Sequence, residues 1–133
     1  AVLTRPSVGF PHDSHFVDLD GKSLEVEKVI EMLTPYMTEE RAARIDKVVS
    51  GRTYNIIPVV EGLYDMGNLA AVCRSADAFG MGSVHCINRK DEKFKQSART
   101  AGGSDRWLDV SVWGSTAECV SAIKGAGYQL VVT

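Results

Sequence analysis

The chain has 133 residues, 44% hydrophobic and 24% charged, a length and a composition typical of one soluble globular domain with a core of its own. No apolar run approaches the roughly 20 residues that span a bilayer, and the first residues lack the pattern of a signal peptide. The net charge of −2 does not by itself indicate a nucleic-acid binder, although residues 1–40 carry −5 and residues 41–133 carry +3.

The first part of the chain is predicted to form an irregular arm and two helices. Residues 1–21 contain prolines and glycines without an apolar stripe, whereas residues 22–34 have apolar residues at helical spacing. A second helix is predicted over residues 38–49, with Thr38 as its N-cap and Gly51 beyond its end. Because the chain does not begin with Met, we expect it to be a processed or trimmed product.

The rest of the chain alternates apolar segments of strand length with helical segments. The predicted strands are residues 55–63, 83–88, 108–113 and 128–133, and the predicted helices are residues 67–79 and 116–124. This alternation predicts an α/β fold, in which a parallel sheet has helices on both faces. Because so few helices cannot cover such a sheet, we expect the chain to be the front part of a longer protein or a fragment that a partner completes.

The predicted helix at residues 67–79 places one large charge among small residues. Its core-facing stripe is Leu69, Val72, Cys73, Ala76 and Phe79, and its other face holds Ala70, Ala71, Ala78 and Arg74. Small residues all round a helix predict close packing on both sides, which would give Arg74 a fixed role at a covered surface. The alternative is an ordinary surface arginine paired with Asp77, three residues further on.

Several familiar sites are missing from the sequence. It has no P-loop, no GxGxxG motif and no metal-ligand spacing, and each histidine (His12, His15, His85) is predicted to be structural or solvated. The three cysteines (Cys73, Cys86, Cys119) lie in apolar patterns without CxxC spacing. They are therefore predicted to be buried and reduced, which points to an intracellular or organellar protein.

The remaining candidates are groups that suit phosphate. Asn68 follows the first predicted strand, where its side chain would either cap the next helix or hold a phosphate beside the exposed N–H groups. The loop at residues 100–104 has two glycines and is flanked by Arg99 and Arg106. A basic ridge, which is either a solvent face or a phosphate contact, consists of Arg41, Arg44 and Lys47, with Arg52 just beyond.

Three segments resemble one family of RNA-modifying enzymes. GNLAAVCRSADAFG, which lies between an apolar strand and a short one, resembles the first motif of the SpoU (TrmH-type) RNA ribose 2′-O-methyltransferases of the SPOUT superfamily. TAGGSDRWLDV is similar to the stretch that follows in that family, and MTEERAARIDKVVSGR is similar to the N-terminal extension of its tRNA-modifying members. The resemblance covers about residues 37–133. It divides the chain into an irregular acidic arm and helix (1–36), a basic helical extension (37–54) and a truncated methyltransferase domain (55–133).

The resemblance implies a function and a set of site residues. Arg74 would be the catalytic arginine at a ribose 2′-hydroxyl, and Asn68 would hold an RNA phosphate. Further phosphate contacts would come from Arg41, Arg44, Arg52, Arg106 and Lys124. The methyl donor would be S-adenosylmethionine, and the substrate a D-loop guanosine of tRNA or otherwise an rRNA. Since a free arginine has a pKa of about 12.5–13.8, Arg74 would act either with a lowered pKa or as a cation that holds phosphate and polarises the hydroxyl.

The sequence departs from the family in one large respect. The family binds its cofactor in a C-terminal knot with Gly–Glu and Ser–Leu–Asn signatures, and neither occurs here. We therefore expect the cofactor site to lie beyond Thr133, the isolated chain to be inactive, and the homodimer of the family to require the full-length protein. A non-catalytic RNA-binding or assembly subunit is the second interpretation, and an unrelated nucleotide-binding α/β domain is the third. The organelle in question would be a chloroplast or mitochondrion, and the cytoplasm is the alternative.

Overall fold

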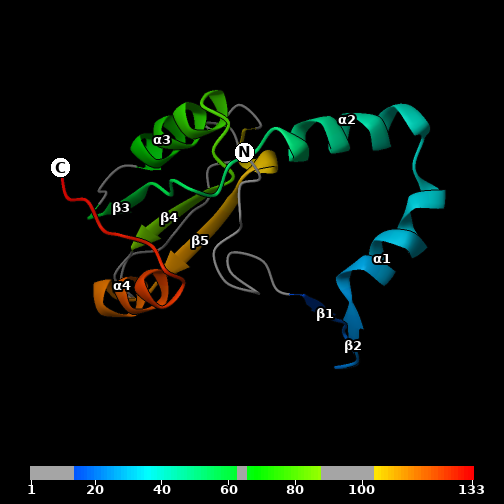
Figure 1. The fold of residues 1–133 in the computed structure, drawn as a ribbon, viewed down its shortest axis with the longest axis horizontal. Helices are drawn as coiled ribbons and strands as arrows, with labels where there is room; N and C mark the ends of the chain where they lie inside the picture. The colour runs from blue at the N-terminus through cyan, green and yellow to red at the C-terminus, as the bar shows by residue number, and fades with distance from the viewer. Residues whose placement is uncertain (1–13, 63–65, 88–103) are drawn as a thin grey trace. The chain divides into compact units, whose positions relative to one another are not determined.

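The computed structural model describes residues 14–62, 66–87 and 104–133 (Figure 1). These fall into two compact units, one of which ends at Gly51 while the other begins at Arg52. The first unit contains a short hairpin and helices, and the second contains the sheet.

The first unit begins with an antiparallel hairpin. Strands β1 (His15–Val17) and β2 (Ser23–Glu25) pair with Phe16 opposite Leu24. The Asp18 carboxylate tightens the connection by accepting hydrogen bonds from the backbone N–H groups of Asp20 and Lys22, at 3.0 and 2.8 Å. The prediction of an irregular arm through residue 21 is therefore wrong for this hairpin.

Two helices and a 3₁₀ turn complete the first unit. They are α1 (Val26–Leu33), η1 (Thr34–Tyr36) and α2 (Glu39–Ser50). Helix α1 starts four residues later than predicted, because residues 23–25 are taken up by the hairpin. Helix α2 agrees with its prediction: the Thr38 hydroxyl accepts a hydrogen bond from the N–H of Arg41, and the helix ends before Gly51. No residue of α1, η1 or α2 is buried.

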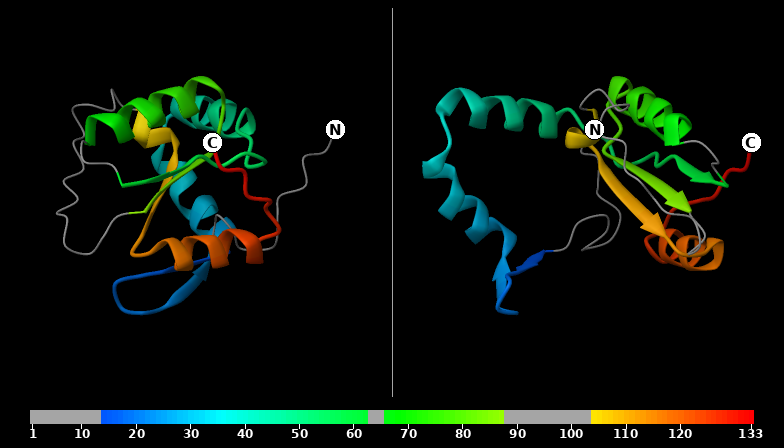
Figure 2. Two further views of the ribbon diagram at one scale, coloured as in Figure 1. Left: turned by 90° about the vertical axis from the view of Figure 1, so that its left-hand side faces the viewer. Right: turned by 180° about the vertical axis from the view of Figure 1, so that it is seen from behind.

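The second unit is built on a parallel sheet in the order β3-β4-β5. Strands β3 (Val59–Glu61), β4 (Ser83–Ile87) and β5 (Asp109–Trp113) are connected through α3 (Met66–Ala78) and the short η2 (Ser104–Trp107), and α4 (Thr116–Gly125) follows β5. The register places Val60 beside Cys86 and Cys86 beside Val112. Helices α3 and α4 lie on opposite faces of the sheet (Figures 1 and 2). The predicted α/β fold is confirmed.

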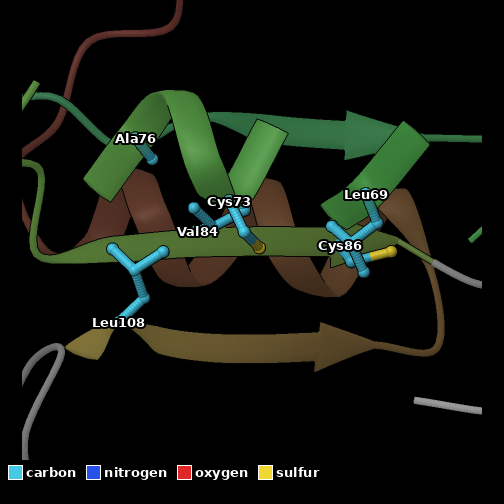
Figure 3. Close-up of a cluster of buried hydrophobic side chains, with 6 residues drawn as sticks. All are labelled: Leu69, Cys73, Ala76, Val84, Cys86 and Leu108. Carbon is cyan, nitrogen blue, oxygen red and sulfur yellow. The ribbon is translucent and has the colours of Figure 1, made fainter. Parts of the chain in front are cut away.

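The main core lies between α3 and the sheet (Figure 3). Its buried members are Leu69, Cys73, Ala76, Val84, Cys86 and Leu108. On the other face, α4 buries Cys119 and Ile123, and the side chain of Ser115 caps its start. All three cysteines are free and buried, as predicted. Burial raises the pKa of the Cys86 and Cys119 thiols, and nearby Glu61 raises that of Cys119 further.

Two predicted strands differ from the structure. The first, predicted over residues 55–63, is reduced to β3, because Pro58 has no N–H to donate and β3 is an edge strand. The second, predicted over residues 128–133, is not a strand in this structure: no other described strand pairs with it, and Val131 and Val132 are largely exposed. Apolar composition alone therefore overestimated the sheet.

Two residues of the predicted α3 stripe are also placed differently. Phe79 lies just after the helix end at Ala78 and is 77% exposed, whereas Ala70, predicted on the outer face, is buried. The rest of the stripe is buried or packs against the core.

Candidate functional site on helix α3

Helix α3 presents a face of small residues around a single arginine. It follows the carboxyl end of β3, and its inner face supplies Leu69, Cys73 and Ala76 to the core. The residues left exposed on its outer side include Ala71, Arg74, Ser75 and Ala78. The structure thus confirms a small-residue face but leaves it exposed in this chain, where a covered surface was predicted.

Asn68 lies on the same helix, close to its first turn. It is the third residue of α3, so it is not the N-cap residue, which was one of its two predicted roles. Its side chain is exposed. The first N–H groups of a helix have no partner within the helix, and together they carry a partial positive charge that favours anions. Asn68 precedes Arg74 by six residues, or about 9 Å along the helix axis. A segment of RNA backbone can span that distance.

An open groove runs beside this face. Its volume is about 330 Å³, and its lining is mostly apolar: Pro58, Ala71, Val72, Ser75, Ala76, Phe79 and Met81. The exposed ring of Phe79 forms part of the wall. The groove offers a surface against which a base or an apolar side chain can stack. One of its lining residues, Ser75, directly follows Arg74 in α3.

Arg52 is placed differently from what its predicted role requires. One guanidinium nitrogen (Nη1) donates to the backbone carbonyls of Asp77 and Met81, at 3.2 and 3.1 Å. The other (Nη2) forms an ion pair with the Asp77 carboxylate, and only 9% of the Arg52 side chain is exposed. The structure therefore gives this guanidinium to protein oxygens, and the expectation that Arg52 binds RNA phosphate does not fit its burial.

The two residues after Arg52 hold the same corner of the fold. Thr53 exchanges backbone hydrogen bonds of 2.8 Å with Gly80 and Gly82. The Tyr54 ring lies directly on Gly82, where an added Cβ would come within 2.4 Å of the ring. We call residues 52–54 the strap.

Two further hydrogen bonds anchor Tyr54 within the second unit. Its hydroxyl donates to the Asp109 carboxylate at 3.0 Å, and its carbonyl accepts from the hydroxyl of Tyr128 at 2.6 Å. Burial raises the pKa of Tyr128, so that this hydroxyl keeps its proton. No sequence pattern predicted the strap. Its one local signal is the pair of glycines around Met81, which marks a turn that another segment approaches closely.

The other predicted phosphate ligands lie on three separate elements. Arg106 is exposed on η2, which packs against α3. Lys124 is exposed in the last turn of α4, on the opposite face of the sheet from α3 (Figure 1). Arg41 and Arg44 are exposed on α2, in the first unit. Within the second unit, Asn68 and Arg106 therefore lie with Arg74 on the α3 side of the sheet, and Lys124 lies on the other side. The glycine loop at residues 100–103 lies outside the described residues.

The buried His85 is structural, as predicted. It lies on the central strand β4, and its Nδ1 accepts a hydrogen bond of 3.2 Å from the indole N–H of Trp113. Burial lowers its pKa. Among the described residues, no group of three acidic, histidine or cysteine side chains is placed to hold a metal ion. None of the described helices is long and apolar enough to cross a membrane.

Known proteins match the part of the chain that contains α3. The SpoU rRNA Methylase family matches residues 55–133, which include all of α3. A tRNA (guanosine(18)-2′-O)-methyltransferase of Borreliella burgdorferi is 29% identical over 109 residues, covering 82% of this chain and 50% of that protein. The Escherichia coli K12 protein of the same name is 29% identical over 97 residues, covering 73% and 42%. The chain thus spans about half the length of the curated relatives it matches.

A solved structure supports the fold. The crystal structure of the A. aeolicus TrmH/SpoU tRNA modifying enzyme matches with a TM-score of 0.61 at 22% identity, over 68% of this chain and 46% of that one.

Proposed function

Because the chain belongs to the SpoU rRNA Methylase family, we propose that the full-length protein methylates a ribose 2′-hydroxyl of RNA, with a guanosine of tRNA as its substrate. The names of the relatives from Borreliella burgdorferi and Escherichia coli support tRNA over rRNA. A protein that modifies tRNA works inside the cell or an organelle, which is where we propose this one acts.

The observation that supports this function best is the exposed Arg74 on the small-residue face of α3. A guanidinium is planar and remains charged, and it binds two phosphate oxygens at once. We propose that Arg74 holds the phosphate next to the acceptor ribose and polarises the 2′-hydroxyl. Methyl transfer then needs little beyond orientation and the loss of one proton. Ala71, Ser75 and Ala78 leave room for the RNA backbone to approach.

The other RNA contacts are proposed at separate places. Asn68 would hold a second phosphate at the start of α3, and Arg106 a third from η2. Arg41 and Arg44 would contact RNA from α2, and Lys124 from the end of α4. We set Arg52 apart from them, because only 9% of its side chain is exposed and its guanidinium binds protein oxygens.

The family implies S-adenosylmethionine as the methyl donor. Among the described residues, the groove beside α3 does not fit that group: it is open and mostly apolar, and no charged side chain lines it to bind the amino and carboxyl groups of the cofactor. We therefore propose that residues outside the described ranges hold the cofactor, and that the homodimer of the full-length protein completes the site.

The test uses the full-length protein and a tRNA transcript. Methyl label supplied on S-adenosylmethionine should appear in the tRNA, and the labelled nucleotide can then be mapped. A transcript with one 2′-deoxyguanosine at that nucleotide should accept no label. Tight binding of tRNA with no label incorporated would contradict methyl transfer and favour the non-catalytic RNA-binding subunit. Label that persists in the 2′-deoxy transcript would contradict a ribose acceptor.

A further inference from the structure

We propose that Arg52 is a positioning residue for Arg74, acting through the carboxyl end of helix α3. This inference rests on the proposed function, and it replaces the role of phosphate ligand that the sequence suggested for Arg52. Its basis is the strap at residues 52–54, which grips the end of α3 and the turn that follows it.

The contacts of Arg52 converge on three oxygens at that end. Two are backbone carbonyls, from Asp77 in the last turn of the helix and from Met81 in the turn, and the third belongs to the Asp77 carboxylate. The last carbonyls of a helix lack partners within the helix and carry a partial negative charge, which a cation stabilises. Only 9% of the Arg52 side chain and 31% of the Asp77 side chain are exposed, so water competes weakly for these bonds.

We call the contacts of Arg52 with these three oxygens the clamp. Its position along α3 links it to Arg74. Asp77 follows Arg74 by three residues, so the two side chains leave the helix on neighbouring sides of adjacent turns. The core packs against the inner face of α3. A contact on Asp77 resists rotation of α3 about its axis, and such a rotation would displace Arg74.

The rest of the strap makes the clamp rigid. Thr53 binds the backbone of Gly80 and Gly82 on both sides of Met81, and Tyr54 closes over Gly82. Arg52 therefore projects from a segment that is itself tied to the corner it clamps. A misplacement of about 1 Å can cost on the order of 100-fold in rate, so a device that fixes the helix carrying a catalytic arginine has a kinetic effect.

The test compares four variants of the full-length protein: Arg52→Ala, Arg52→Lys, Asp77→Asn and the double variant Arg52→Ala/Asp77→Asn. Each is assayed for kcat and KM of tRNA methylation, for the salt dependence of tRNA affinity and for amide exchange at Gly80 and Met81. Arg106→Ala serves as the comparison for a lost phosphate contact.

The positioning role predicts a specific pattern. Arg52→Ala and Asp77→Asn should each lower kcat about 10- to 100-fold with KM almost unchanged, and the double variant should be no worse than the poorer single one. Arg52→Lys should also lose activity, because one ammonium cannot span three oxygens. The salt slope of binding should stay at the wild-type value in all four, whereas Arg106→Ala should reduce it by about 1.

Other outcomes overturn the inference. Arg52 is a phosphate ligand if Arg52→Ala reduces the salt slope as Arg106→Ala does, while Arg52→Lys and Asp77→Asn behave as wild type. It has a merely structural role if the variants lower the melting temperature but keep the wild-type kcat well below it. Amide exchange separates this inference from the proposed function. If the wild-type protein transfers no methyl group, the proposed function fails. If exchange at Gly80 and Met81 is the same in Arg52→Ala as in the wild-type protein, Arg52 does not hold the end of α3 and this inference fails.

Discussion

At the scale of single residues, two arginines in the second unit have opposite surroundings. Arg52 is largely buried against carbonyl and carboxylate oxygens, and Arg74 is exposed on a face of small side chains. The sequence places both in segments similar to the same family, and it does not tell which guanidinium faces RNA. The difference arises from Asp77, which is 25 residues away from Arg52 in the chain and adjacent to it in the fold. Pairing of this kind cannot be predicted from local spacing.

His85 makes the stability of the second unit sensitive to acid. Its pKa is lowered by burial, so the unfolded chain binds a proton at a higher pH than the folded one does. Stability should therefore be constant above the ordinary histidine pKa of about 6.5 and fall below it, by up to about 1.4 kcal/mol per pH unit. Protonation of His85 would also put a hydrogen on Nδ1, the atom that accepts from the Trp113 indole N–H, and this hydrogen bond would be lost.

Urea unfolding between pH 5 and 8 measures this effect. The variant His85→Asn keeps a hydrogen-bond acceptor for Trp113 and should flatten the pH dependence, whereas the exposed His15→Asn should not. Equal pH dependence in wild type and His85→Asn would show that another group controls acid stability.

At the scale of elements, the sequence predicts best the helices and strands that have a clear apolar pattern of their own. Helices α2, α3 and α4 and strands β4 and β5 lie within a few residues of their predicted ranges. The errors concern short pieces whose partners decide them: the hairpin β1–β2, the three-residue edge strand β3 and the apolar end at residues 128–133. A strand forms only when it pairs with a neighbouring strand, and the local sequence pattern does not show whether that neighbour is present.

Helix α2 provides the test at this scale. Arg41 and Arg44 are exposed three residues apart, and Lys47 continues the series into the last turn. If the helix contacts RNA phosphate, Arg41→Ala/Arg44→Ala should lower tRNA affinity and reduce its salt slope by about 2, with no change in thermal stability. A matched control is Lys22→Ala/Lys28→Ala, which removes two exposed charges from the same unit, in the acidic range of residues 1–40. A salt slope that is equal in wild type and both double variants would identify α2 as a solvated face.

At the scale of the whole molecule, the family match and the structural division nearly coincide. The family covers residues 55–133, and the second compact unit begins at Arg52. We keep the finer division, with an arm to residue 36 and a basic extension to residue 54, as a proposal. The strap explains why the boundary lies where it does, because Arg52, Thr53 and Tyr54 each bind the α/β unit.

The central claim is that Arg74 acts on the RNA ribose from the outer face of α3. The most direct test is single-turnover methyl transfer to tRNA by the full-length protein with Arg74→Ala, at saturating tRNA and cofactor. Because the side chain is exposed and outside the core, the variant should keep the wild-type melting temperature while its rate falls by at least about 100-fold. Arg74→Ala that methylates tRNA at the wild-type rate would contradict the account.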